Sequence, residues 1–299
     1  MRRYLTLAAL LTALGLLFAA CGGGGDGTNG DSPATDGAIV PVSGNSELVL
    51  GANRFALGLL ADSNQPILGE PGVSVRFRFF YEDESKGEQD ASFVWAIPDI
   101  TGFFVANVDF DQAGNWQVEA VVTQDGDETI VDRLSFSVRA ESQVPNIGDA
   151  APPSTNLTLS QEPNVKRLST DQDPEPTFYQ MTVAEALAAG QPLLVVFATP
   201  AFCETRFCGP VVDNVKEVSP EFEDRLVFIH IEPFELDGDG QLVTGEDGFP
   251  VPVGAVVEWN LPTEPWVFII DAQGRITARF EGAAGPEELR EAIKGVLAG

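Results

Sequence analysis

The sequence predicts a chain of two folded domains, an all-β immunoglobulin-like sandwich at residues 47–140 and an α/β domain at residues 154–299. The first prediction comes from short runs in which apolar and polar residues alternate, the pattern of half-buried strands. The second comes from a switch, after residue 153, to helical and strand patterns that follow one another in turn, which is typical of α/β folds. Residues 141–153, which contain several prolines, form the predicted linker between the two domains.

A secretory signal is predicted at residues 1–20, where a basic start precedes an apolar run that is short for a membrane-spanning helix. Small residues then precede Cys21, and this arrangement resembles the lipobox of bacterial lipoproteins. The resemblance implies cleavage before Cys21 and a lipid on its sulfur; an ordinary signal peptide with a chance cysteine is the alternative. Residues 21–46 are rich in Gly, Asp, Ser and Thr and are expected to form a flexible tether. We therefore expect an extracytoplasmic protein that is anchored to the cell membrane through Cys21.

The predicted sandwich contains several short strands separated by turns. The candidate strands are residues 48–50, 55–59, 73–79, 102–108, 116–122 and 134–138. Turn-forming residues at 111–114 and 125–127 are typical of hairpins. Trp95 and Trp116 are expected to be core aromatic residues. The number and spacing of these strands predict the immunoglobulin-like sandwich, in which we find no catalytic constellation.

The predicted α/β domain contains a helix whose start is marked by a capping box of Thr182 and Glu185 and whose end is marked by Gly190. The later elements are a strand at 192–198, a helix to about residue 219, a strand at 225–231, a hairpin of 266–271 with 275–280, and a last helix beginning at Pro286.

The formal net charge of −28 excludes some classes of partner. An acidic surface repels phosphate backbones, so nucleic acid is not an expected partner. It also opposes electrostatic docking on anionic lipid, which leaves the anchor at Cys21 to hold the protein at the membrane. We interpret the acidity as a device for solubility or as an adaptation to a saline habitat.

Cys203 and Cys208 follow a buried-looking strand and lie just before or within a helical run. Unpaired N–H groups and the positive end of the helix dipole favour a thiolate at such a junction. A lipid on Cys21 leaves these two as the only free cysteines, and disulfides persist outside the cytoplasm. A chain of 299 residues can bury a core without such a cross-link, so a lone close pair indicates activity more than structural support.

Helix geometry restricts where the two cysteines can lie if they are bonded to each other. Residues five apart in a regular helix are about 8 Å apart, beyond the roughly 7 Å between Cα atoms that a disulfide spans. At least one cysteine must therefore lie outside regular helix. Pro210 favours a helix that begins just after Cys208, with Cys203 on the preceding loop. The alternative places Pro210 in the middle of a helix as a kink.

Four segments in order along the second half resemble the thioredoxin superfamily, most closely its exported, membrane-tethered members. These segments are residues 147–152, 184–197, 265–271 and 274–282. The resemblance implies an α/β thioredoxin-like fold over about residues 147–299 and a cis peptide bond before Pro265. The chain departs from the family at the active site, because four residues separate Cys203 from Cys208 where family members have two.

The resemblance implies a thiol-disulfide oxidoreductase that exchanges disulfides with a protein substrate. We expect Cys203 to be the nucleophile and Cys208 the resolving cysteine, although the spacing leaves the reverse assignment open. The charge of Arg206 would stabilise a thiolate and that of Glu204 would oppose it. Pro265 is expected to border the site, with Glu264 and Trp266 flanking it at the substrate. An unknown membrane or extracellular electron donor would complete the cycle, and no cofactor is expected.

Two other functions are compatible with the sequence. One is copper binding, as in the Sco-type proteins, which use two cysteines and a histidine; here the only histidine is His230, within an apolar strand where a buried structural role is more common. The other is an inert disulfide in a surface interaction module. The acidic segment at 237–248 does not meet the requirements of an EF-hand loop and is interpreted as a surface loop.

Overall fold

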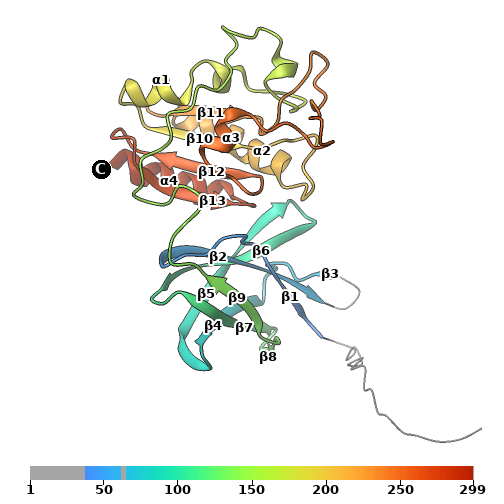
Figure 1. The fold of residues 1–299 in the computed structure, drawn as a ribbon. Coiled ribbons are helices and arrows are strands. Elements are labelled where there is room, and N and C mark those ends of the chain that lie inside the picture. The colour runs from blue at the N-terminus through green and yellow to red at the C-terminus, as the bar shows by residue number, and fades with distance from the viewer. Residues whose placement is uncertain (1–37, 62–64, 299) are drawn as a thin grey trace, which may run out of the picture. The chain divides into compact units, whose positions relative to one another are not determined.

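The computed structural model describes residues 38–61 and 65–298 (Figure 1). Residue contacts join the described residues into one compact unit, which contains a nine-stranded and a four-stranded sheet. The predicted boundaries of the domains and of the linker at 141–153 stay predictions.

The larger sheet is antiparallel, and its main strands lie in the order β1-β2-β6-β5-β4-β7-β8. β3 pairs with β2, and β9 pairs with β7. The strands are β1 (Val40–Ser43), β2 (Gly51–Ala61), β3 (Gln65–Pro66), β4 (Val73–Tyr81), β5 (Glu84–Ile97), β6 (Thr101–Phe110), β7 (Gly114–Gln124), β8 (Asp127–Ile130) and β9 (Leu134–Val138).

The long strand β5 makes this sheet curl around one core. Its first half pairs with β4 up to Ala91, and its second half pairs with β6 from Ser92 onward. The enclosed core is rich in aromatic rings, among them Phe55, which packs edge-to-face against Phe77 and Phe79 at 5.4 Å and 5.2 Å between centroids.

The two tryptophans that were expected in this core differ in their burial. Trp116 is 2% exposed, and its indole N–H donates to the carbonyl of Gln112 at 2.9 Å. Trp95 is 37% exposed, so its assignment to the core was wrong. It lies near the end of β5, where its ring packs edge-to-face against Phe93 at 4.9 Å between centroids and otherwise faces solvent.

The smaller sheet has the order β11-β10-β12-β13, with β10 and β11 parallel and the other pairs antiparallel. Its strands are β10 (Leu193–Phe197), β11 (Val227–Ile231), β12 (Trp266–Ile270) and β13 (Ile276–Glu281). The α-helices are α1 (Val183–Ala188), α2 (Cys208–Val218), α3 (Gly254–Glu258) and α4 (Pro286–Ala298). Short 3-10 helices are η2 (Val165–Arg167), η3 (Pro176–Tyr179) and η4 (Ser219–Glu221).

Side chains of β10 alternate between two apolar layers because successive strand residues point to opposite faces. Leu194 and Val196 pack with α2 and α4. Leu193, Val195 and Phe197 pack with α1 and α3. The strand is therefore buried on both faces, and its end is fixed in position. The capping box predicted at the start of α1 is confirmed, since the side chains of Thr182 and Glu185 each accept the other's backbone N–H.

The predicted fold class, an α/β thioredoxin-like fold after an immunoglobulin-like sandwich, needs correction. Strands account for 39% and helices for 17% of the described part of the chain, so the fold is mostly β. The largest sheet has nine strands and is nearly closed, while α1 and α3 have only six and five residues. The sequence pattern underestimated the strand content because the first half of β5 is polar and exposed and shows no alternation.

The N-terminal predictions fall on residues outside those described. The signal peptide at 1–20, the lipid on Cys21 and most of the tether at 21–46 lie there, so the structure gives the lipoprotein and signal-peptide predictions no support. Among residues 38–61 and 65–298, no helix is long and apolar enough to cross a membrane.

Replacing Phe55 with alanine is expected to lower the free energy of unfolding by about 3–5 kcal/mol, because its ring is fully buried among other rings. The matched control is Phe249→Ala, because Phe249 is 70% exposed and should change stability by less than about 0.5 kcal/mol. Urea denaturation followed by tryptophan fluorescence measures both. Equal effects of the two substitutions would contradict this description of the core.

Candidate functional site

The cysteine pair forms a disulfide at the junction of β10 and α2. The Cα atoms of Cys203 and Cys208 are 6.0 Å apart, within the range that a disulfide spans. Cys203 lies on the loop that follows β10, and Cys208 is the first residue of α2. The helix therefore begins at Cys208 and not just after it, and Pro210 lies in its first turn, where proline is tolerated.

The two sulfur-bearing residues differ in burial. Cys208 has no exposed surface and belongs to the apolar layer beneath α2. Cys203 is partly buried and packs against the edge of that layer. An external thiol therefore reaches the pair from the side of Cys203.

The start of α2 provides hydrogen bonds to the Cys203 sulfur. The backbone N–H of Cys208 donates to Cys203 Sγ at 3.3 Å, and the Thr205 hydroxyl lies 3.2 Å from the same sulfur. Phe207, the residue before the helix, makes no side-chain cap hydrogen bond. The sulfur thus accepts one of the N–H groups that have no partner within the helix, at the end where the helix dipole favours negative charge.

Arg206 and Glu204 lie on the exposed part of the cysteine loop. Arg206 has a positive φ of 65°, and its backbone N–H donates to the carbonyl of Cys203 at 3.2 Å, which closes a tight turn between the cysteines. Two opposite charges therefore stand on either side of Thr205 at the surface.

The peptide bond between Glu264 and Pro265 is cis, as expected. Burial, followed by the negative charge of Glu204, raises the pKa of the Glu264 carboxyl. The charge of Glu204, the neighbour of Cys203 in the chain, therefore acts on the Glu264 carboxyl.

Trp266 points away from the disulfide. It belongs to the apolar layer of α1 and α3, whereas Cys208 and Val267 belong to the layer of α2 and α4. Its ring is 1% exposed and stacks on Phe268 at 5.7 Å. A substrate cannot contact this indole without unfolding the strand, so the structure makes Trp266 a core residue.

Sequence reasoning missed a polar group buried next to the cysteine loop. Glu232, directly after β11, is 4% exposed, and burial raises its pKa to about 7. Its carboxylate accepts from the backbone N–H of Thr170 at 2.9 Å and from the Thr170 hydroxyl at 3.1 Å. The available signal was a charged residue directly after a buried strand in which His230 is the only polar residue.

His230 is held as a neutral, structural residue. Its Nδ1 lies 2.7 Å from the hydroxyl of Tyr179, and its Nε2 lies 2.9 Å from the carbonyl of Ala198. Because a carbonyl only accepts, Nε2 carries the proton and Nδ1 accepts from Tyr179. Burial lowers the pKa of His230 to about 4. Both ring nitrogens are occupied, and the described residues hold no group of three or more His, Cys, Asp or Glu suited to a metal ion.

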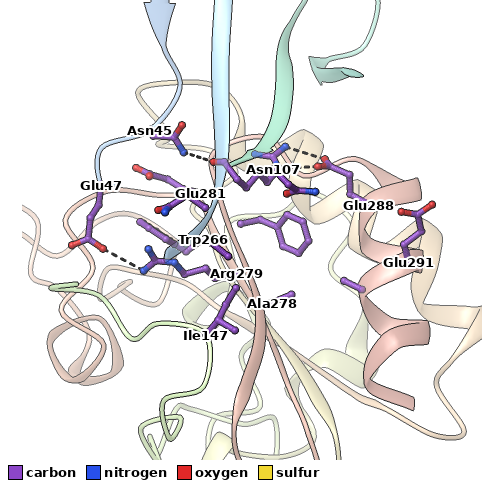
Figure 2. A pocket seen from close by; sticks show the side chains of 15 residues that line it. Asn45, Glu47, Asn107, Ile147, Trp266, Ala278, Arg279, Glu281, Glu288 and Glu291 are labelled. Carbon is purple, nitrogen blue, oxygen red and sulfur yellow. Dashed lines mark hydrogen bonds and ion pairs between the residues drawn. The ribbon is translucent and has the colours of Figure 1, made fainter. Parts of the chain in front are cut away.

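A pocket of about 320 Å³ lies between β2, β13 and α4 (Figure 2). Its charged side chains largely satisfy one another. Arg54 and Glu288 are 2.8 Å apart, and Arg279 and Glu47 are 3.2 Å apart. Glu281 accepts from the backbone N–H of Ser46 at 3.0 Å. These pairs join β2 and the segment before it to α4 and β13 and leave few charged groups free for a ligand, so this pocket is a weaker functional candidate than the disulfide.

Comparison with known proteins gives no family assignment. No family model matches the chain, and no curated protein matches it. Among solved structures, a CARDB domain from Pyrococcus furiosus, solved with di-metal ions, is 14% identical, with a TM-score of 0.21; the match covers 36% of this chain and 94% of that one. A cohesin module from a Clostridium perfringens glycoside hydrolase is 18% identical, with coverages of 36% and 99% and a TM-score of 0.17. MtrC from Shewanella baltica is 11% identical, with coverages of 48% and 28% and a TM-score of 0.24.

Similarities with TM-scores this low do not indicate a function for this chain. None of these three structures is a thioredoxin, and the correction to a mostly β fold rests on the strand content and topology described above. The site is therefore interpreted from its own geometry.

Replacing Glu232 with glutamine is expected to change how stability depends on pH. The pKa of Glu232 is raised to about 7 in the folded chain, whereas an unfolded glutamate has a pKa of about 4.3. The folded state therefore binds the proton more tightly, and this contribution is fully present below about pH 4 and is lost as the pH rises through about 7. As the pH rises from about 4 to about 7, the free energy of unfolding of Glu232→Gln should therefore rise by about 2–4 kcal/mol relative to that of wild type.

Urea denaturation of both proteins at several pH values measures this difference. His230 contributes with the opposite sign, because its pKa is lowered, but it is present in both proteins and its contribution cancels in the comparison. A difference in unfolding free energy that stays constant across the pH range would show that Glu232 has the same pKa in both states.

Proposed function

We propose that this protein exchanges disulfides with a protein substrate through Cys203 and Cys208. The observation that carries the proposal is the asymmetry of the disulfide. The Cys203 sulfur is on a partly exposed loop and accepts the first N–H of α2, whereas Cys208 is fully buried. The same hydrogen bond would stabilise a thiolate on Cys203 once the disulfide opens, which favours reactivity at this sulfur.

The exchange can be written as two displacements. A substrate thiolate attacks the Cys203 sulfur, the Cys203–Cys208 bond breaks, and the Cys208 sulfur leaves with the electron pair and takes up a proton. A second substrate thiolate then attacks the substrate sulfur of the mixed disulfide, and the Cys203 sulfur leaves as a thiolate. The substrate dithiol becomes a disulfide, and two electrons pass to the cysteine pair. The reverse sequence reduces a substrate disulfide, with Cys203 as the nucleophile and Cys208 as the resolving cysteine.

The surroundings of Cys203 support these roles. The dipole of α2 and the N–H of Cys208 stabilise a thiolate on Cys203. In this proposal the turn at Glu264 and Pro265 would border the loop and contact the substrate chain, and Arg206 would contribute a cation at the surface. Trp266 has no part in the proposal, because it is buried on the other face of the sheet.

The proposal includes a protein partner, a separate electron donor and an extracytoplasmic location. A disulfide persists in an oxidising compartment, and without a donor or acceptor the pair would act only once. The difference between an oxidant and a reductant lies in the reduction potential of the pair.

Single cysteine substitutions test the proposed roles. In the full chain carrying Cys208→Ser, the Cys203 thiolate is expected to attack the disulfide of an oxidised model protein and to remain in a stable mixed disulfide, because the resolving thiol is missing. With Cys203→Ser, the buried Cys208 should react at least about tenfold more slowly with the same protein and with iodoacetamide, since burial limits access and thiolate formation. Mass spectrometry identifies the adducts.

Circular dichroism spectra of both variants provide the control for folding. Equal reactivity of the two single-cysteine variants would contradict the asymmetry on which the proposal rests. Failure of both to form adducts in the folded state would indicate a structural cross-link in an interaction module.

A further inference from the structure

A continuous series of hydrogen bonds joins Glu232 to the cysteine loop. The carboxylate of Glu232 accepts from the hydroxyl of Thr170 at 3.1 Å. The oxygen of that hydroxyl accepts in turn from the backbone N–H of Ala201 at 3.1 Å. Ala201 lies two residues before Cys203, so the buried acid holds the loop through one threonine side chain.

The same segment also holds the helix that carries Cys208. Next to Thr170, Asp171 pairs with Lys216 of α2 at 2.8 Å. Lys216 also donates to the carbonyl of Asp173 at 3.2 Å. Residues 169–173 therefore contact both sides of the disulfide, the loop through Thr170 and the helix through Asp171.

Glu232 lines a cavity of about 390 Å³, through which water can exchange its proton. The charged groups on this cavity are Arg167, Glu235 and Glu258. The negative charge of Glu264 acts on Glu232 from the side of β12. Toward α2 and η3, the titratable groups are Asp171, Lys216, Tyr179 and His230.

We propose that Glu232 is a positioning residue that couples its own proton to the reduction of the Cys203–Cys208 disulfide through Thr170 and Ala201. When the carboxylate is ionised, it fixes the Thr170 hydroxyl as a donor and so leaves the hydroxyl oxygen directed at Ala201. When it is protonated, this charge-assisted hydrogen bond weakens and the loop is held less firmly.

This inference deepens the proposed function and rests on it. Reduction breaks the sulfur–sulfur bond: two glutathione thiols supply two electrons and become glutathione disulfide, and the cysteine sulfurs take up the protons that these thiols release to water. Glu232 contacts neither sulfur in this scheme. It only exchanges a proton with solvent, and its charge state changes the relative stability of the oxidised and reduced loop.

The test is a glutathione titration of the full chain from pH 5.5 to pH 8.5, comparing wild type, Glu232→Gln and Glu235→Gln. Glu235 is the matched control, because it lines the same cavity, is exposed and loses the same charge. For wild type and for Glu235→Gln, a plot of the logarithm of the equilibrium constant for reduction against pH should change slope near neutral pH. The plot for Glu232→Gln should lack this change of slope. At one end of the pH range its equilibrium constant should differ from that of wild type by about threefold to tenfold.

Two further variants test the route through Thr170. Thr170→Ser keeps the hydroxyl, so its equilibrium constant for reduction should depend on pH as in wild type. Thr170→Val lacks the hydroxyl and should lose most of the change of slope near neutral pH. Amide hydrogen exchange at Ala201 should be faster in Thr170→Val than in Thr170→Ser.

The inference is overturned if wild type titrates reversibly and Glu232→Gln gives the same pH profile, or if Glu235→Gln gives the same change as Glu232→Gln. In both cases the proposed function stands. If the wild-type disulfide is not reversibly reduced at any pH, the proposed function and this inference both fail.

Discussion

The geometry of the candidate site depends on the burial of β10. All five of its side chains have no exposed surface, and the strand is hydrogen-bonded along both edges, to β11 and to β12. A one-residue slip would turn every apolar side chain toward the opposite layer, so the register is strongly fixed. Because β10 and β11 are parallel, they end at the same edge of the sheet. The cysteine loop after β10 and Glu232 after β11 therefore meet there as a consequence of one packing constraint.

Two electrostatic effects oppose each other at the disulfide. The start of α2 favours a thiolate on Cys203, through its dipole and the N–H of Cys208. The acidic side chains of Glu204, Glu264 and Glu232 oppose it, on a chain with a formal net charge of −28. The raised pKa of Glu264 shows that the surroundings already disfavour a further negative charge. If the pair exchanges disulfides as proposed, the balance of these effects, and neither one alone, determines whether it acts as an oxidant or a reductant.

Local features of the site could be predicted from the sequence because each depends on neighbouring residues. The capping box at Thr182 and the position of Cys203 before a helix depend on a few adjacent side chains. The cis bond before Pro265 followed from the resemblance of a short segment to a known motif.

Features that depend on distant contacts could not be predicted in this way. Glu232 and Thr170 are 62 residues apart, and nothing local indicates that they meet. The polar first half of β5 gives no alternating pattern, because its side chains are polar and face solvent. The predicted fold class was wrong for the same reason, since short motifs were extended to a whole domain while the larger sheet was underestimated. Trp266 was misplaced because a one-residue step along a strand reverses the side of the sheet that a side chain faces.

The most direct test of the central claim is the redox equilibrium of Cys203 and Cys208 in the full, folded chain at neutral pH. Glutathione buffers set the potential, and thiol alkylation followed by mass spectrometry counts the reduced cysteines. If the pair exchanges disulfides, both thiols should appear together in a reversible two-electron transition while the far-ultraviolet circular dichroism stays unchanged. A disulfide that opens only when the chain unfolds would contradict the claim and would leave the bond as a structural cross-link.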